Sequence, residues 1–154
     1  MTKAKKIIYW VATLWLALGM TATAFGQLFK LPGQGGPDMI THLGYPVYVL
    51  TILGVWKILG VVALLIPKFP LLKEWAYAGF FFAMSGAVFS HSAVGDPARE
   101  VFPGLLLLIL TLVSWHFRPA DRKIIAVTQS SYGQQFALPK TATEEHGSHG
   151  AVVA

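Results

Sequence analysis

The fold is decided by the stretch Tyr45-Pro-Val-Tyr-Val-Leu-Thr-Ile-Leu-Gly-Val-Trp-Lys57-Ile-Leu-Gly-Val-Val-Ala-Leu-Leu-Ile66. Its 22 residues form a helix roughly 33 Å long at about 1.5 Å per residue, which is enough to cross the hydrocarbon core of a bilayer. Apart from Lys57 the stretch is almost wholly apolar. It therefore predicts a membrane-spanning helix with one lysine near its middle.

A lysine at that depth needs an explanation, because it costs about 2.5–3.5 kcal/mol on insertion scales. About nine residues, roughly 13 Å, separate Lys57 from the inner end of its helix, so its side chain reaches only part of the way to water. We therefore expect Lys57 to have a function or an internal partner. The predicted spans hold no acidic residue, so the expected partner is a backbone carbonyl, Ser85, a tyrosine or a bound anion. The alternative is a lysine that only stretches towards one interface.

The composition points to a membrane domain. Of 154 residues, 55% are hydrophobic and only 12% are charged. The net charge of +5 comes from basic residues at the ends of apolar runs, which is typical of membrane orientation and argues against a nucleic-acid partner. The absence of cysteine excludes disulfides, iron–sulfur clusters and cysteine-held zinc within the chain.

Four apolar runs predict four spans, at about 7–29, 45–66, 75–94 and 101–117. Pro- and Gly-containing segments separate them. The predicted fold is an all-α integral membrane four-helix bundle over residues 1–122, followed by a flexible cytoplasmic tail over 123–154.

The positive charges predict the orientation of the bundle. Eight lie on one side (Lys3, Lys5, Lys6, Lys68, Lys73, Arg118, Arg122 and Lys123), and two lie on the other (Lys30 and Arg99). This bias predicts a multi-pass protein of the bacterial inner membrane with both termini in the cytoplasm. In an alternative interpretation the first run is a signal peptide cleaved near Ala22-Thr-Ala24, although the apolar run continues to Phe29.

Helix packing is predicted from small residues. One face of the third span carries Ala76, Gly79, Ala83, Gly86 and Ser90. Small side chains let helix backbones approach in lipid, so this face is expected to be the main packing seam. The opposite side, with Phe81, Phe82 and Phe89, is expected to meet lipid.

A polar constellation is predicted at the outer face of the membrane. The spans end or begin there with Gln27, Tyr45, Ser90 and His91, and the connectors add His42 and Asp96. With Lys57 and its neighbour Trp56, these are the candidate ligand-binding residues. Two histidines with a nearby carboxylate can relay protons, bind a divalent metal or hydrogen-bond the head of a quinone. Their spacing matches no defined metal motif, so no metal ligand is assigned, and the alternative is an ordinary polar rim.

Four segments carry a family resemblance: His42-Leu-Gly-Tyr-Pro46, Leu53-Gly-Val-Trp-Lys-Ile-Leu-Gly60, Glu74-Trp-Ala-Tyr-Ala-Gly79 and Ser90-His-Ser-Ala-Val-Gly-Asp96. In this order they resemble the DoxX-like family of small bacterial four-helix membrane proteins, over roughly residues 7–119. The family includes a quinone-linked subunit of a thiosulfate-oxidising membrane complex, proteins grouped with oxidative-stress partners, and distant animal relatives that help receptors assemble. The resemblance implies no catalytic residue, but Lys57, His91 and Asp96 lie in its segments.

Together these observations predict a non-catalytic or accessory subunit of a membrane redox system, which binds a quinone-like or lipid molecule between helices. The expected partners are the bilayer and either a membrane redox complex or further copies of the chain. One alternative is an assembly or chaperone-like partner of another membrane protein. A small-solute carrier is disfavoured, because four helices enclose little interior.

Overall fold

The computed structural model describes residues 2–33 and 35–123, and every regular element in these ranges is a helix. The elements are α1 (Lys3–Leu28), α2 (Pro37–His42), α3 (Tyr48–Leu65), α4 (Pro70–Ala93), α5 (Ala98–His116) and the 3₁₀ helix η1 (Ala120–Arg122). All belong to one compact unit, Met1–Ile124. After Lys123, the predicted tail lies outside the described residues.

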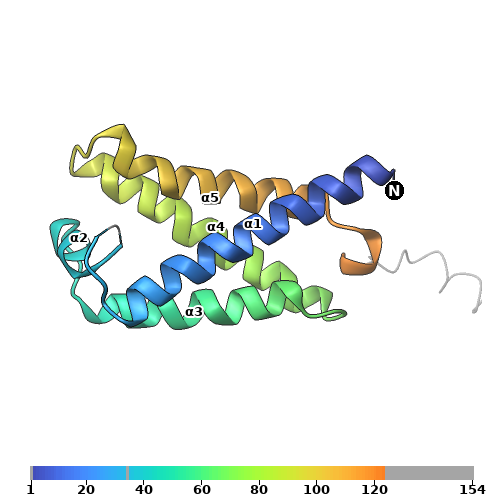
Figure 1. Ribbon diagram of the computed structural model, residues 1–154, viewed down its shortest axis with the longest axis horizontal. Coiled ribbons are helices and arrows are strands. Elements are labelled where there is room, and N and C mark those ends of the chain that lie inside the picture. Colours follow the sequence, from blue (N-terminus) through green and yellow to red (C-terminus); the bar gives the residue numbers. More distant parts are fainter. Residues whose placement is uncertain (1, 34, 124–154) are drawn as a thin grey trace, which may run out of the picture. The chain divides into compact units, whose positions relative to one another are not determined.

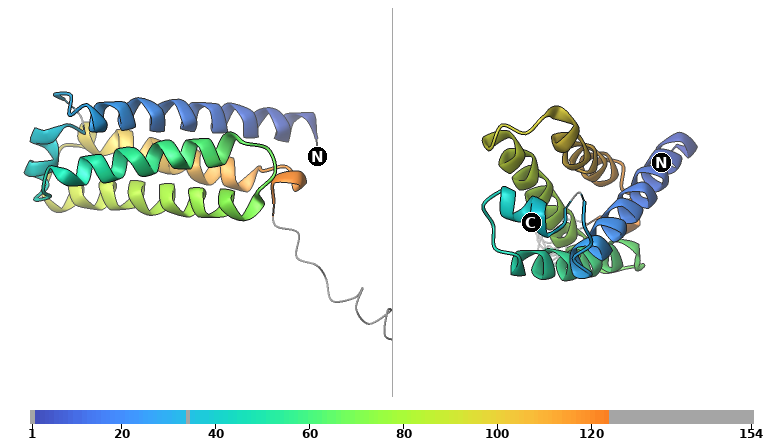
Figure 2. Two further views of the ribbon diagram at one scale, coloured as in Figure 1. Left: turned by 90° about the horizontal axis from the view of Figure 1, so that it is seen from below. Right: turned by 60° about the vertical axis from the view of Figure 1, so that its left-hand side comes forward.

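The four long helices form a ring in which each packs against the next along the chain. α1 packs on α3, α3 on α4, α4 on α5, and α5 returns to α1. Figures 1 and 2 show the four running side by side, with α2 at the end of the unit opposite the N-terminus. The all-α prediction with membrane-like helices is confirmed.

The predicted spans match the long helices to within a few residues. Three of them, α1, α3 and α5, are long and apolar enough to cross a membrane. α4 has 24 residues, which gives a length of about 36 Å, but polar residues at both of its ends dilute its apolar character. Its role as a fourth span stays a prediction. The short helix α2 was not predicted, because Pro and Gly around it are typical of a loop.

The core lies between the helices in the middle of the bundle. Leu16 and Met20 of α1 and Leu64 of α3 are fully buried, and Phe80 and Met84 of α4 and Leu107 of α5 pack against them. Because lipid is as apolar as these side chains, close dispersion contact and hydrogen bonds must hold the helices together.

The predicted packing seam on α4 is wrong at its glycines. Gly79 and Gly86 are exposed, and no atom would lie within 4 Å of a Cβ added at either position. The buried face of α4 instead carries large side chains, namely Lys73, Tyr77, Phe80 and Met84. The close approaches occur elsewhere: a Cβ at Gly54 would lie 2.6 Å from Leu28, and one at Gly60 would lie 2.6 Å from Phe80. The outward placement of Phe81, Phe82 and Phe89 agrees with the prediction.

Buried hydroxyl groups link three helices near the N-terminal end of α1. Ser114 of α5 lies 2.7 Å from the hydroxyl of Thr13 on α1 and 2.7 Å from that of Tyr77 on α4. All three residues are at most 3% exposed. In a low-dielectric interior such bonds have no competing water, so this network ties α1, α4 and α5 together.

Basic side chains close the same end of the bundle. The ammonium of Lys73 donates to the carbonyls of Ala63, at 2.9 Å, and Leu64, at 3.0 Å, and also to that of Ile66. These are carbonyls that the end of α3 leaves without helical partners, so Lys73 caps α3. Arg118 pairs with Glu74 at 2.6 Å.

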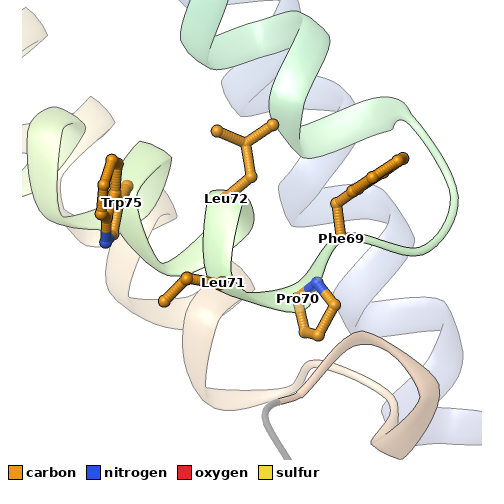
Figure 3. A pocket seen from close by; sticks show the side chains of 5 residues that line it. All are labelled: Phe69, Pro70, Leu71, Leu72 and Trp75. Carbon is orange, nitrogen blue, oxygen red and sulfur yellow. The ribbon is translucent and has the colours of Figure 1, made fainter.

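A surface hollow of about 380 Å³ lies at the start of α4, lined by Phe69, Pro70, Leu71, Leu72 and Trp75. Figure 3 shows that all five come from this one segment. Four of them are exposed and none carries a charge. The hollow therefore suits contact with lipid and offers no chemistry for a specific site.

We predict that Gly54→Leu destabilises the bundle by about 1–3 kcal/mol, because the new side chain meets Leu28 and the Ala24 carbonyl. Gly79→Leu is the matched control, and it should change stability by less than about 0.5 kcal/mol, since it faces open space. Thermal unfolding of both variants in one detergent measures the difference. Equal losses would show that the packing faces are assigned wrongly.

Candidate functional site

Lys57 lies inside the bundle, as expected, and has a partner from another helix. It is 6% exposed, and its ammonium donates to the Thr23 hydroxyl of α1 at 3.1 Å. Thr23 in turn donates to the carbonyl of Gly19 or Met20. The expected partners were different: Ser85 bonds the carbonyl of Phe82 instead. An ammonium has three protons, and one hydroxyl uses one of them.

A cavity of about 120 Å³ opens beside the Lys57 side chain, in the half of the bundle that holds α2. Its polar lining residues are Thr23, Gln27, Lys57, His91 and Glu100. Its apolar lining includes Met39 of α2, Met84 of α4 and Leu107 of α5. Every long helix and α2 therefore contribute to one small site, and three of the predicted residues (Gln27, Lys57 and His91) meet there.

Gln27 leaves a polar atom unsatisfied at this cavity. The residue is 7% exposed, and within residues 2–33 and 35–123 its Oε1 is the buried side-chain atom that has no hydrogen-bond partner. A buried amide oxygen without a donor costs about 1–3 kcal/mol. An unpaired buried atom of this kind calls for an explanation, such as a bound water, ion or ligand.

Asp96 links the cavity wall to helix α2. Its Oδ2 lies 2.7 Å from Nδ1 of His91, and its Oδ1 lies 2.8 Å from Nε2 of His42. Hydrogen bonds from His42 and then His91 lower the pKa of Asp96 below its ordinary value, so it stays ionised at neutral pH. An ionised carboxylate only accepts hydrogen bonds, so Nδ1 of His91 carries the proton. One carboxylate thus orients a cavity histidine and holds α2 over the site.

The remaining candidates lie outside the cavity. The Tyr45 hydroxyl and Ser90 Oγ lie 2.9 Å apart in an exposed pair, which joins the segment just before α3 to α4. Trp56 is 67% exposed and does not line the cavity. Its predicted role beside Lys57 has no support in the contacts, because adjacent helical residues point in different directions.

Two polar cavity residues, Thr23 and Glu100, were missing from the predicted set of ligand-binding residues. Thr23 precedes Gln27 by four residues, so both lie on one face of α1. Two polar residues at this spacing on one face of a largely apolar helix are a signal that the sequence did contain. Within the described residues, no group of three or more His, Cys, Asp or Glu side chains is arranged to hold a metal ion.

The cavity is separated from the opposite end of the bundle by apolar side chains. Thr23 lies ten residues from Thr13 along α1, about 15 Å. Leu16, Met20 and their core neighbours fill the space between these two levels. The cavity and the buried hydroxyl network are therefore distinct.

We predict that the two buried lysines respond differently to replacement by methionine. Lys73→Met should lower stability by at least about 2 kcal/mol, because three carbonyls lose their donor. Lys57→Met should be at least as stable as the native chain, since it removes a costly charge that has a single hydroxyl partner. Thermal unfolding in detergent compares them. An equal loss in both would make Lys57 a structural residue.

The comparisons with known proteins agree with the family resemblance. The model of the DoxX-like family matches residues 11–113, which include Lys57, His91 and Asp96 and most of the core. No curated protein and no solved structure matches the chain. Since the match covers well over half of its length, the chain belongs to the DoxX-like family.

Proposed function

We propose that this DoxX-like membrane protein is an accessory subunit of a membrane redox system and binds the head of a quinone-like molecule in the Lys57 cavity. The observation that carries the proposal is one cavity lined both by Lys57 and by Gln27, whose buried Oε1 is unpaired among the described residues. A polar head on an apolar molecule supplies the missing hydrogen bonds, and the helices can contact its tail.

The lining of the cavity supports the polar head of an apolar ligand. At about 120 Å³ the cavity is smaller than the roughly 150 Å³ that holds one benzene molecule, so as it stands it admits only part of a ring head. Met39, Met84 and Leu107 offer apolar contact to a ring, while Lys57, Gln27 and His91 would hold its oxygen atoms. A bound quinone would supply the two-electron redox chemistry that the side chains of this chain lack. A free anion is a poorer fit, because the Glu100 carboxylate also lines the cavity.

The accessory role follows from what this chain contributes. It contains no cysteine, so thiol chemistry and iron–sulfur electron transfer must belong to a partner. The cavity residues hold and orient a ligand: Lys57 donates, Gln27 accepts, and Asp96 fixes the tautomer of His91. These roles are those of a ligand-binding subunit.

We predict that the protein, extracted gently from its own membrane, retains an organic ligand that native mass spectrometry detects and solvent extraction identifies. Lys57→Met should fold normally and lose most of this ligand, because the cavity loses its donor. Trp56→Leu is the matched control, since Trp56 is the exposed neighbour in the sequence, and it should retain the ligand. Recovery of one protein partner without a ligand would instead favour an assembly role.

The proposal includes an inner-membrane location with the N-terminal end of α1 in the cytoplasm. The exposed lysines Lys3, Lys5, Lys6, Lys68 and Lys123 support it, because they belong to the start of α1, the α3–α4 connection and the residue after η1. Figure 2 shows these three segments at one end of the unit. The cavity would then lie in the outer half of the bundle.

A reporter fusion tests this orientation. If the C-terminal end is cytoplasmic, green fluorescent protein fused after Ala154 should fluoresce. Alkaline phosphatase fused at the same position should then be inactive. The reverse pattern would place the cavity in the cytoplasmic half and overturn the orientation.

A further inference from the structure

The charges are not balanced at the end of the bundle where α1 begins. Among the described residues, Arg118 and Glu74 form the one ion pair at this end. Arg122 is also buried, at 9% exposed, but its Nη1 donates to two neutral groups, the Tyr9 hydroxyl at 3.1 Å and the Leu64 carbonyl at 3.2 Å. Because a guanidinium stays charged at any ordinary pH, Arg122 is a buried cation without a paired carboxylate in this part of the chain.

A second buried cation makes the imbalance larger. Lys73 is 1% exposed and donates to the same Leu64 carbonyl, at 3.0 Å. Since Lys73 and Arg122 share one acceptor, two like charges are held close together and repel each other. The carboxylate of Asp121 offsets only part of this charge, because it is exposed and water screens it. A further anion at this end would stabilise both cations.

Exposed lysines lie on both sides of Arg122. Its guanidinium lies over the Trp10 ring, 4.9 Å from the centroid, and this contact joins η1 to the start of α1. Lys6 is exposed and precedes Trp10 by four residues, so the two share a face of α1. Lys123 is exposed and follows Arg122 directly. Lys6, Arg122 and Lys123 therefore form one positively charged surface between α1 and η1, which we call the basic corner.

The basic corner lies at the level expected for lipid headgroups. The apolar run of α1 begins at Ile7, directly after Lys6. Trp10, Trp75 and Trp115 come from three helices near this end of the unit, and tryptophan rings concentrate where a membrane meets water. Clusters of basic residues at this level attract anionic lipids.

We propose that the basic corner binds the phosphate of an anionic phospholipid, with Arg122 beneath the phosphate and Lys6 and Lys123 beside it. The acyl chains of this lipid would lie along the apolar outer surface of the helices. A lipid is favoured over a soluble anion because the corner faces the headgroup layer of the membrane. The corner and the Lys57 cavity lie in opposite halves of the bundle, so the inference goes beyond the proposed function and does not depend on it.

Native mass spectrometry of the delipidated full chain in detergent tests the proposal. Phosphatidylglycerol and phosphatidylcholine with identical acyl chains are added separately at rising concentrations. The native chain should bind phosphatidylglycerol at least about tenfold more tightly, because its headgroup has a net negative charge and that of phosphatidylcholine has none. Equal affinities would overturn the proposal.

Single variants locate the site. Lys6→Gln and Lys123→Gln should each weaken phosphatidylglycerol binding about fivefold and leave phosphatidylcholine binding within about twofold, since each removes one charge. Lys30→Gln is the matched control, because Lys30 is an exposed lysine beyond the other end of α1, and it should change neither affinity. An equal loss in Lys30→Gln would show a response to net charge alone and overturn the assignment to the corner.

Competition separates a lipid from a soluble phosphate. Glycerol 3-phosphate at millimolar concentration should leave bound phosphatidylglycerol in place, because it lacks the apolar chains that also hold the lipid. Its displacement of the lipid would show that the corner binds a free phosphate and would overturn the lipid assignment. The comparison of headgroups on the native chain needs no variant, so the proposal can fail even when a variant folds poorly.

Discussion

Satisfying polar groups away from water is the constraint on which this structure depends. Inside a bilayer, lipid offers no hydrogen bonds, so each buried donor and acceptor must find a partner in the chain. The hydroxyl network of Thr13, Tyr77 and Ser114 meets this requirement among three helices. Lys73 meets it too, since its ammonium is shared among the final carbonyls of α3. The end of the bundle where α1 begins is thus internally complete.

In the opposite half of the bundle, some buried polar groups have too few hydrogen-bond partners among the described residues. Lys57 has one hydroxyl partner, and Gln27 Oε1 has none among the described residues. The same chain that supplies Lys73 with three acceptors leaves Lys57 with one, so the difference is not a general tolerance of buried charge. The polar groups that lack hydrogen-bond partners therefore belong to residues that line a cavity. A ligand that supplied these hydrogen bonds would stabilise the folded protein when it binds. This contrast is the physical basis for treating Lys57 as functional and Lys73 as structural.

The sequence predicts the helices well and their rotations poorly, for one physical reason. Length and apolarity determine that a segment is a spanning helix, and a lone lysine must face inward, so α3 and Lys57 followed from the sequence. The rotation of α4 did not, because its small face and its aromatic face are both apolar and both suit lipid. The structure turns Tyr77, Phe80 and Met84 inward and leaves Gly79 and Gly86 outside. The pairing of His91 with Asp96 could be predicted from the sequence, because the two residues are only five positions apart. The contact of Asp96 with His42 could not, because it depends on the unpredicted helix α2.

The arrangement also bears on how a ligand would reach the site. Leu16, Met20 and the rest of the core separate the cavity from the cytoplasmic end proposed for the bundle, so passage of a solute through the bundle would require this core to separate. Access is simpler from the half that contains α2, where Met39 and Gly35 form part of the cavity wall. Asp96 holds α2 through His42 and orients the cavity residue His91 with its other oxygen. A displacement of α2 would therefore disturb the histidine that lines the cavity, and occupancy of the proposed site would in turn stabilise α2 in place. In the proposed site, one carboxylate joins the covering helix α2 to the cavity residue His91, an arrangement that suits retention of a ligand better than its passage.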